Sequence, residues 1–421
     1  MSISVEEASA RILEPIRPLA DEDVRIADAL GRVLAADVKS SVVLPPWDNA
    51  GMDGYAVRAE DLTGLPRMLP VSGVIAAGSR VAHELARGTA MRIMTGAPLP
   101  GGADTVIRVE DTDGGTEQVV IRGGRDLRKN VRFKGNELKS GDVALSAGTV
   151  IGPAQLGVLA SIGAARFRAH KLPRVGVIAS GDELVDLDRF AEVANGHAIV
   201  SSNSYSIRAA AIAAGATIAD YGIVRDEPRA LANRLDAART SSLIVTTGGV
   251  SVGAFDHTRD VVRQMGGDVR IDRVRMRPGA PLAFGMIGDT PWLGLPGNPV
   301  SALVTFELFG RPLIRRLRGE RAVFPLPVPC IVDEPVDLAA PLTHFLRCTL
   351  IAGNDGELHA RLTGSQSSAL LTSMTIASAL LIIPHDRPAV RPGDRLTAFL
   401  AGDGGRTDTF RLDLQPGESA K

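Results

Sequence analysis

Three apolar segments of this chain each run into acidic residues, and this repeated placement constrains the fold more than any other feature. The segments are residues 174–179 before Asp182 and Glu183, residues 219–224 before Asp226, and residues 243–245 before a glycine-rich turn and Asp256. Because helical sequence follows each acid, the pattern predicts repeated strand–helix units of a mostly parallel sheet. Ligands of such sheets bind beyond the carboxyl ends of the strands, so we expect the acids to share one edge of the sheet.

The glycine-rich turn covers residues 246–253 and includes Gly248, Gly249 and Ser251. It is neither a Walker A loop nor a dinucleotide-binding GxGxxG motif. It could be a tight turn that needs positive φ angles, but two adjacent glycines and several hydroxyls at the end of a strand favour an anion site. Together with the acids, the turn predicts a phosphorylated ligand that is handled with a divalent cation.

Each acid also has a structural interpretation. Asp256 could cap the helix that follows it, and Asp226 lies before Pro228, where helices often begin. Taken singly, these capping roles are supported at least as well as functional ones. Glu183 is harder to explain in this way, because glutamate is a poor N-cap. Three acids converging on one sheet edge favour metal or proton chemistry for the set.

The composition excludes several classes of protein. The chain has 421 residues, 45% of them apolar, which is too long for a single core and predicts about two to four domains. A net charge of −1 and 4% aromatic residues argue against binding to nucleic acid or to an anionic membrane. The two cysteines, Cys330 and Cys348, form neither a metal-ligand spacing nor a disulfide framework. No N-terminal apolar segment or long apolar span is present, so we expect a cytoplasmic protein.

The residue types, and with them the predicted secondary structure, change along the chain. Ser4 and Glu7 form a capping-box pattern at the start of a first helix. From about residue 61, short β-branched runs are separated by Gly, Pro and Asp, which predicts a β-rich domain inserted between helical pieces. The strand–helix units begin at about Pro173, and residues from about 330 to 400 show the short alternating strands of a small β-barrel.

Residues 293–302 predict a strand, a rigid turn and a helix, with Pro296 and Pro299 restricting the backbone around Asn298. Backbone N–H groups at the start of that helix could face a ligand. Alternatively, the segment could be a stiff connection with Ser301 inside a helical turn. The residues alone favour neither interpretation.

Basic residues suggest oxyanion binding in two places. Arg275 and Arg277 are two positions apart in an extended segment and so face one side, either as an oxyanion clamp or as two exposed strand residues. A second basic run, in the inserted domain, contains Arg132. A charge run is usually a solvated face, but the planar donor fork of arginine suits oxyanions, so a subset of this run could face an anion.

Five stretches of the chain together resemble the MoeA family of molybdopterin molybdenumtransferases, which includes the E domain of gephyrin. They follow the family's order and span nearly the whole chain apart from its tail: residues 48–57 (DNAGMDGYAV), 95–98 (TGAP), 181–184 (GDEL), 248–253 (GGVSVG) and 295–302 (LPGNPVSA). Any one of these motifs is weak evidence, whereas all of them in the right order are highly specific.

The resemblance implies a multidomain α/β and β protein that assembles as an elongated homodimer. The four implied domains are an elongated helical linker domain (1–60 and 140–172), an inserted β-rich domain (61–139), a three-layer molybdopterin-binding α/β domain (173–322) and a C-terminal β-barrel (323–402). The polar, glycine-rich composition of residues 403–421 predicts a flexible tail outside the resemblance. The implied reaction inserts molybdate into adenylylated molybdopterin and releases AMP with the help of Mg²⁺. Its site would lie between the α/β domain of one subunit and the inserted domain of the other. A molybdopterin adenylyltransferase and cofactor-accepting molybdoenzymes are candidate partners.

The resemblance also implies roles for individual residues. The implied catalytic residues are Asp53, Glu183, Asp226 and Asp256, and the last three form the implied Mg²⁺ site. The predicted substrate-binding residues are Thr95, Arg132, Glu137, Gly248, Gly249, Ser251, Arg275, Arg277, Pro296, Asn298, Pro299 and Ser301. Within this scheme Glu183 would position water or molybdate, and the arginines would bind anionic oxygens.

The chain departs from the family pattern at two positions. Glu137 follows Gly-Asn where the family has Gly-Glu-Asp, which moves the carboxylate outward by one methylene. Arg277 and Ala280 stand where the family has the two lysines of a KPGKP motif, so one positive charge is kept as a guanidinium and the other is lost. Either Arg275 compensates for the missing charge, or oxyanion affinity is weaker.

Two other functions share parts of this pattern. Molybdopterin adenylyltransferases have the α/β domain, but they carry a GGTG-type loop that residues 248–251 do not match, and they need neither the inserted nor the barrel domain. A non-catalytic pterin-binding scaffold is the other alternative, although all of the implied catalytic acids are present and no long disordered linker is predicted. The sequence does not distinguish molybdate from tungstate as the substrate, because both are tetrahedral oxyanions of nearly equal size and charge.

Overall fold

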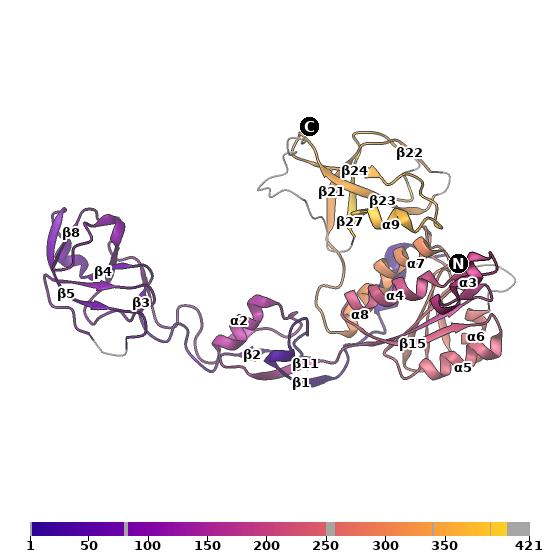
Figure 1. The fold of residues 1–421 in the computed structure, drawn as a ribbon, viewed down its shortest axis with the longest axis horizontal. Coiled ribbons are helices and arrows are strands. Elements are labelled where there is room, and N and C mark those ends of the chain that lie inside the picture. Colours follow the sequence, from indigo (N-terminus) through magenta and orange to yellow (C-terminus); the bar gives the residue numbers. More distant parts are fainter. Residues whose placement is uncertain (1, 80–82, 250–256, 339–340, 388, 402–421) are drawn as a thin grey trace.

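The computed structural model describes residues 2–79, 83–249, 257–338, 341–387 and 389–401. The molecule is elongated, with a β domain at one end and an α/β domain and a β-barrel at the other (Figure 1). A narrow linker made of two chain segments joins the ends. We call the β domain that stands alone at its end of the molecule the distal β domain.

The α/β domain is built on a six-stranded sheet of order β15-β12-β16-β20-β19-β17. Its strands are β12 (Arg174–Ser180), β15 (Thr217–Val224), β16 (Leu243–Thr247), β17 (Asp268–Ile271), β19 (Ala283–Ile287) and β20 (Thr290–Leu295). The first four strands in spatial order are parallel, and β19 is antiparallel to its neighbours. The predicted parallel strand–helix units are therefore confirmed, with a hairpin added at one edge.

Helices cover both faces of this sheet, which gives the predicted three layers. They are α4 (Ser202–Ala213), α5 (Pro228–Ala238), α6 (Thr258–Gln264), α7 (Pro299–Thr305) and α8 (Arg311–Leu317), with a π-helical turn η5 (Phe306–Gly310) between the last two. The short helix α3 (Phe190–Ala194) lies beside β14 (Ile199–Val200) and buries none of its residues. Alternate residues of β16 enter two separate cores: Leu243 and Val245 face α4 and the α7–α8 run, whereas Ile244 faces α5 and α6. None of the helices in the described ranges is both long and apolar enough to cross a membrane.

The C-terminal domain is a closed barrel, as predicted. Its strands are β21 (Pro327–Val332), β23 (Thr343–Ala352), β24 (Leu358–Leu362), β25 (Ala379–Ile383) and β27 (Arg395–Leu400), and it also contains β22 (Val336–Asp337), α9 (Thr372–Ile376) and β26 (Ala389–Val390). The ring closes because the long strand β23 pairs with both β24 and β25. Cys330 and Cys348 are free thiols buried in the barrel core, in line with the absence of a disulfide framework.

The distal β domain contains a five-stranded sheet of order β7-β4-β6-β5-β8. Its strands are β4 (Gly54–Val57), β5 (Arg67–Ile75), β6 (Ala90–Ile93), β7 (Thr105–Arg108) and β8 (Gln118–Ile121), accompanied by the ribbon β3 (Asn49–Ala50) with β9 (Val131–Arg132) and by the short helical turns η2 (Ala59–Leu62) and η3 (Val109–Asp111). The internal strand β4 pairs on both sides, and all of its residues are buried.

The linker is mostly extended chain, which differs from the predicted helical linker. It consists of two ribbons, β1 (Asp21–Arg25) with β11 (Arg166–His170) and β2 (Val38–Lys39) with β10 (Val143–Leu145), plus the turn η1 (Ile26–Asp28) and the single α-helix α2 (Pro153–Ser161). The first helix of the chain, α1 (Val5–Leu13), has Ser4 as its N-cap, as predicted. Its apolar face joins the core of the α/β domain rather than the linker, because Ala8, Ile12 and Leu13 pack there.

Candidate active site

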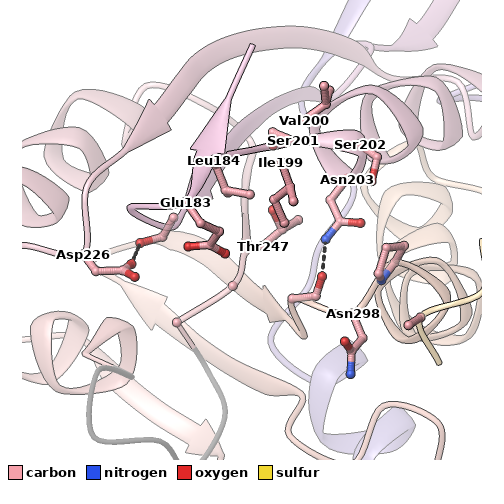
Figure 2. A pocket seen from close by; sticks show the side chains of 16 residues that line it. Glu183, Leu184, Ile199, Val200, Ser201, Ser202, Asn203, Asp226, Thr247 and Asn298 are labelled. Atoms are coloured by element: carbon pink, nitrogen blue, oxygen red, sulfur yellow. Dashed lines mark hydrogen bonds between the residues drawn. The ribbon is translucent and has the colours of Figure 1, made fainter. Parts of the chain in front are cut away.

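The carboxyl ends of β12, β15 and β16 meet at one edge of the α/β sheet, where a cavity of about 510 Å³ opens. We call it the edge cavity, and it is lined by Ser180, Glu183, Leu184, Ile199, Val200, Ser201, Ser202, Asn203, Asp226, Thr247, Gly248, Gly249, Gly297, Asn298, Pro299 and Ala369 (Figure 2). The predicted convergence at this edge is confirmed for Glu183 and Asp226. Asp256 and Ser251 lie outside the described residues.

Two short strands turn the connection after β12 into one wall of the edge cavity. Instead of leading straight into a helix, Glu183 is followed by β13 (Leu184–Val185), which pairs with β14 (Ile199–Val200) just before α4. Leu184 and Ile199 therefore lie opposite each other in register and present an apolar surface to the cavity. A flat ring system can rest on a surface of this kind.

The glycine turn after β16 confirms the predicted positive φ angles of a tight turn, whereas its use as an anion site stays a prediction. Gly248 and Gly249 have φ angles of +86° and +65°, and both line the edge cavity. A Cβ at Gly248 would lie 2.4 Å from the carbonyl oxygen of Ser180, and a Cβ at Gly249 would lie 2.2 Å from Oγ1 of Thr258. Glycine is therefore required for the turn, and its absent side chains leave backbone exposed to a ligand.

Asp226 is held at the rim of the edge cavity by the neighbouring strand. The hydroxyl of Ser180 donates to its Oδ1 at 2.5 Å, shown as a dashed line in Figure 2, and its backbone N–H donates to Oδ1 of Asp182 at 3.3 Å. On its other side Asp226 borders a smaller cavity of about 440 Å³ that is lined with Asp182, Arg225 and Glu227.

The turn between β20 and α7 forms the opposite wall. Asn298 and Pro299 line the cavity, whereas Pro296 and Ser301 are buried behind it. The side-chain amide of Asn203, from α4, donates to the carbonyl oxygen of Gly297 at 2.8 Å. The predicted rigid turn is therefore also braced from another helix.

A loop of the barrel completes this wall. The side-chain amide of Asn298 donates to Oγ of Ser368 at 3.2 Å, and the backbone N–H of Val300 donates to the carbonyl oxygen of Ser368 at 3.1 Å. The next residue, Ala369, lines the edge cavity. Two domains thus build the site.

The charged residues among the described lining of the edge cavity are all acidic. Glu183 and Asp226 are its charged residues, and no Lys, Arg or His is found among its described lining residues. The first turn of α4 adds N–H groups and the positive end of a helix dipole near Ser202. An anionic ligand would therefore need positive charge from elsewhere.

A divalent cation is compatible with these residues. Mg²⁺ prefers oxygen ligands and is commonly held by one or two carboxylates together with substrate phosphates. Oδ2 of Asp226 makes no hydrogen bond or ion pair with another described residue, and Asp226 lines the edge cavity. No cluster of three or more His, Cys, Asp or Glu side chains suited to a metal occurs in the described part of the chain.

The structure places Arg275 and Arg277 outside the lining of the edge cavity. They flank Met276 in and beside β18 (Met276–Arg277), which adds to the barrel next to β23. Both arginines are exposed while Met276 is buried, so they lie on one side of the strand as predicted.

The remaining predicted residues lie in and around the distal β domain, far from the edge cavity of the same chain (Figure 1). Oδ1 of Asp53 accepts hydrogen bonds from the backbone N–H of Thr95 at 2.6 Å and from its hydroxyl at 2.8 Å. These two bonds, the backbone one first, lower the pKa of Asp53 below its usual value. Arg132, on β9, and Glu137 are exposed.

Several residues of the site were not found from the sequence. A hydroxyl at the end of an apolar strand was a usable signal for Ser180. Asn203 follows a serine run at a helix start, which indicates capping rather than a site. Ala369 gives no signal, because a small apolar residue in a loop is common and its place depends on how the two domains dock.

The comparisons with known proteins agree with this architecture. Residues 176–316, which contain most of the α/β sheet and every described lining residue of the edge cavity except Ala369, match the family model described as "Probable molybdopterin binding domain". Residues 3–163 match the model of the MoeA N-terminal region (domains I and II), and residues 331–400 match that of the MoeA C-terminal region (domain IV). The chain belongs to the MoeA family.

Individual relatives match over almost the full length. The Mycobacterium tuberculosis protein named molybdopterin molybdenumtransferase 1 is 36% identical over 434 aligned positions, covering 95% of this chain and 100% of that protein. A Nostoc protein named molybdopterin molybdenumtransferase is 37% identical over 409 positions, covering 91% of each chain. The solved structure of the molybdopterin biosynthesis MoeA protein from Pyrococcus horikoshii aligns with a TM-score of 0.79 at 25% identity, covering 95% of this chain and 100% of that one.

Proposed function

We propose that this chain is a transferase of molybdenum cofactor biosynthesis that inserts molybdenum into molybdopterin. Its substrates would be adenylylated molybdopterin and molybdate, and AMP would be released. The observation that carries the proposal is the edge cavity, in which a glycine turn, two carboxylates and an apolar wall converge within the domain that matches the molybdopterin-binding model. Full-length relatives named molybdopterin molybdenumtransferase support it.

The residues of the cavity suit the separate parts of such a substrate. Leu184 and Ile199 offer an apolar surface for the pterin ring. The exposed backbone of Gly248 and Gly249 can approach phosphate oxygens closely. Glu183, which is exposed at the rim, would position water or molybdate.

We assign the cation site to Asp226 and Glu183, with Asp256 as the further acid. A bound Mg²⁺ would neutralise charge on the diphosphate as the phosphoanhydride bond breaks. Asp226 would contribute through Oδ2, since its Oδ1 already accepts a hydrogen bond.

We also propose that a homodimer completes the site. The edge cavity has no basic lining residue among those described, whereas the distal β domain carries the exposed Arg132 together with Asp53 and Thr95. Within one chain these groups lie at opposite ends of the molecule (Figure 1). A second copy would bring its distal β domain to the cavity and supply the missing positive charge. Glu137, Arg275 and Arg277 stay predictions for substrate contacts at the margins of that composite site.

The test is a reconstitution assay with the purified full-length chain. It is incubated with adenylylated molybdopterin and Mg²⁺, with molybdate, with tungstate, or with neither oxyanion, while AMP release and activation of a cofactor-free molybdoenzyme are followed. Molybdate-dependent release of AMP together with activation is the expected result. A parallel incubation with molybdopterin and ATP tests the adenylyltransferase alternative. Tight pterin binding without turnover in any arm would overturn the proposal in favour of a scaffold.

A further inference from the structure

Ser180 ends the strand that lies between the two other cavity-forming strands, β15 and β16. The residue is 6% exposed, and its hydroxyl donates to Oδ1 of Asp226 at 2.5 Å. Its carbonyl oxygen lies where a side chain on Gly248 would have to go. One residue therefore contacts the acid that follows one neighbouring strand and lies against the glycine turn that follows the other.

The hydrogen bond from Ser180 makes the two carboxylate oxygens of Asp226 different from each other. Oδ1 is engaged, whereas Oδ2 has no partner within the part of the chain that the structure describes. A hydroxyl that donates to a carboxylate makes a short, charge-assisted bond. That bond restricts rotation of the carboxyl group, and so determines which oxygen is left for a ligand.

We propose that Ser180 is a positioning residue for Asp226: its hydroxyl occupies Oδ1 and leaves Oδ2 directed to the cation of a phosphorylated ligand. This inference rests on the proposed function, because it assumes that Asp226 meets such a cation. Without the hydroxyl, the Asp226 carboxyl group samples several orientations, and ordering it costs free energy at the moment of binding. Ser180 itself does not need to touch the substrate.

The experiment uses the full-length chain and four substitutions: Ser180→Ala, Ser180→Thr, Asp226→Ala and Ser180→Ala combined with Asp226→Ala. Ser241→Ala is the matched control, because Ser241 is also 6% exposed but lies at the opposite, amino-terminal edge of the same sheet. Two readouts are taken for every variant. One is molybdate-dependent AMP release, and the other is the affinity for Mn²⁺, a paramagnetic substitute for Mg²⁺, measured by electron paramagnetic resonance. Thermal unfolding shows which variants are folded.

Loss of the hydroxyl is expected to lower turnover and Mn²⁺ affinity by about 10- to 100-fold, the usual effect of removing a hydrogen bond to a charged group. Ser180→Thr retains the hydroxyl and should stay within about threefold of the unaltered chain. Ser241→Ala should match the unaltered chain. In the Asp226→Ala background, Ser180→Ala should weaken Mn²⁺ binding no further, because a positioning residue acts only through its partner.

Three results would overturn the inference. They are an unaffected Ser180→Ala variant, a folded Ser180→Thr variant that fails to recover, and an equal loss of Mn²⁺ affinity with and without Asp226. If the unaltered chain binds Mn²⁺ but releases no AMP, the proposed function fails while the Mn²⁺ series still decides the role of Ser180. If the unaltered chain binds no Mn²⁺, the role assigned to Ser180 fails as well.

Discussion

Two carboxylates at opposite ends of the molecule are held in nearly the same way, yet in different surroundings. Asp226, at the edge cavity, accepts one hydrogen bond at Oδ1 from the buried hydroxyl of Ser180. Asp53, in the distal β domain, accepts two at Oδ1, from the backbone N–H and the hydroxyl of Thr95. Among the described residues, Oδ2 of each acid is left without a partner.

The difference lies in what surrounds each acid. Asp226 borders a cavity that has acids and a glycine turn but no basic lining residue among those described. Asp53 is exposed, and both hydrogen bonds that its side chain accepts come from Thr95 of its own domain. The two carboxylates are thus held in place by their own domains, one beside a cavity without a described basic lining residue and one on an exposed surface. This difference is what the proposed homodimer would explain, and the mixing experiment below tests it.

The largest expected effect is the loss of activity when either acid is replaced, followed by partial recovery when the two variants are mixed. Under the proposed function, Asp226→Ala and Asp53→Ala should each lower AMP release by at least about 100-fold, because each would remove a carboxylate from the reacting site. If sites are shared between subunits, an equal mixture of the two variants after subunit exchange forms heterodimers with one intact site. Activity should then return to about a quarter of that of the unaltered chain, given random pairing.

The control for this mixture is Asp226→Ala combined with a chain that carries both substitutions. Every site in that mixture lacks Asp226, so no activity should return. Native mass spectrometry checks that heterodimers have formed in both mixtures. Heterodimers without recovered activity would show that Asp53 and Asp226 do not serve one composite site.

The next largest effect concerns β4, the strand that begins directly after Asp53. A Cβ on Gly54 would lie 1.9 Å from the backbone carbonyl oxygen of Ile107, inside a strand that pairs on both sides. Gly54→Ala should destabilise the distal β domain by about 3 kcal/mol or more, since the backbone must move. Hydrogen exchange should accelerate across β4 and β7 but not across β16. Gly73→Ala is the matched control, because its Cβ would approach only Cε of Met91, at 4.0 Å.

Much of the α/β domain could be predicted from the sequence because its signals are local. Apolar strands followed by acids and helices determine a parallel sheet, and a parallel sheet brings its carboxyl ends together, which places Glu183 and Asp226 in one cavity. Ser4 was likewise recognisable as a cap from the Glu that follows three residues later.

The parts that could not be predicted depend on contacts between distant segments. In the linker, β1 pairs with β11 and Asp21 lies opposite His170, and no local sequence pattern predicts that pairing. Ala369 enters the cavity wall only because the barrel docks beside Asn298. The partner of the Ser180 hydroxyl follows from the register of β12 with β15, which sequence periodicity alone does not determine.

A smaller effect is expected at the glycine turn of the edge cavity. Gly248 and Gly266 both have positive φ angles, +86° and +77°, so alanine is strained at either position. Only at Gly248 would the added Cβ also meet an atom, the carbonyl oxygen of Ser180 at 2.4 Å, whereas Gly266 has nothing within 4 Å. Gly248→Ala should therefore cost about 1 kcal/mol more than Gly266→Ala. This should appear as a melting temperature about 2–4 °C lower. Equal melting temperatures would show that the turn can move away from Ser180.

The smallest effect separates the two hydrogen bonds that hold Asp53. Thr95→Val removes the hydroxyl but keeps the backbone N–H, which is the larger cause of the lowered pKa. The pKa of Asp53 should therefore rise only part of the way to its usual value, and Thr95→Ser should leave it low.

Because the folded-state pKa of Asp53 is depressed, the stability that Asp53 contributes is present above its unfolded-state pKa of about 4 and is lost as the pH falls through the folded value. The change is thus confined to acid pH and can be followed by carbon-13 NMR titration of the carboxyl group. Asp126 serves as an internal reference, because Arg108 lowers its pKa to about 2 independently of Thr95. A full return of the Asp53 pKa in Thr95→Val would mean that the hydroxyl also orients the N–H, and that Asp53 depends on one side chain as closely as Asp226 depends on Ser180.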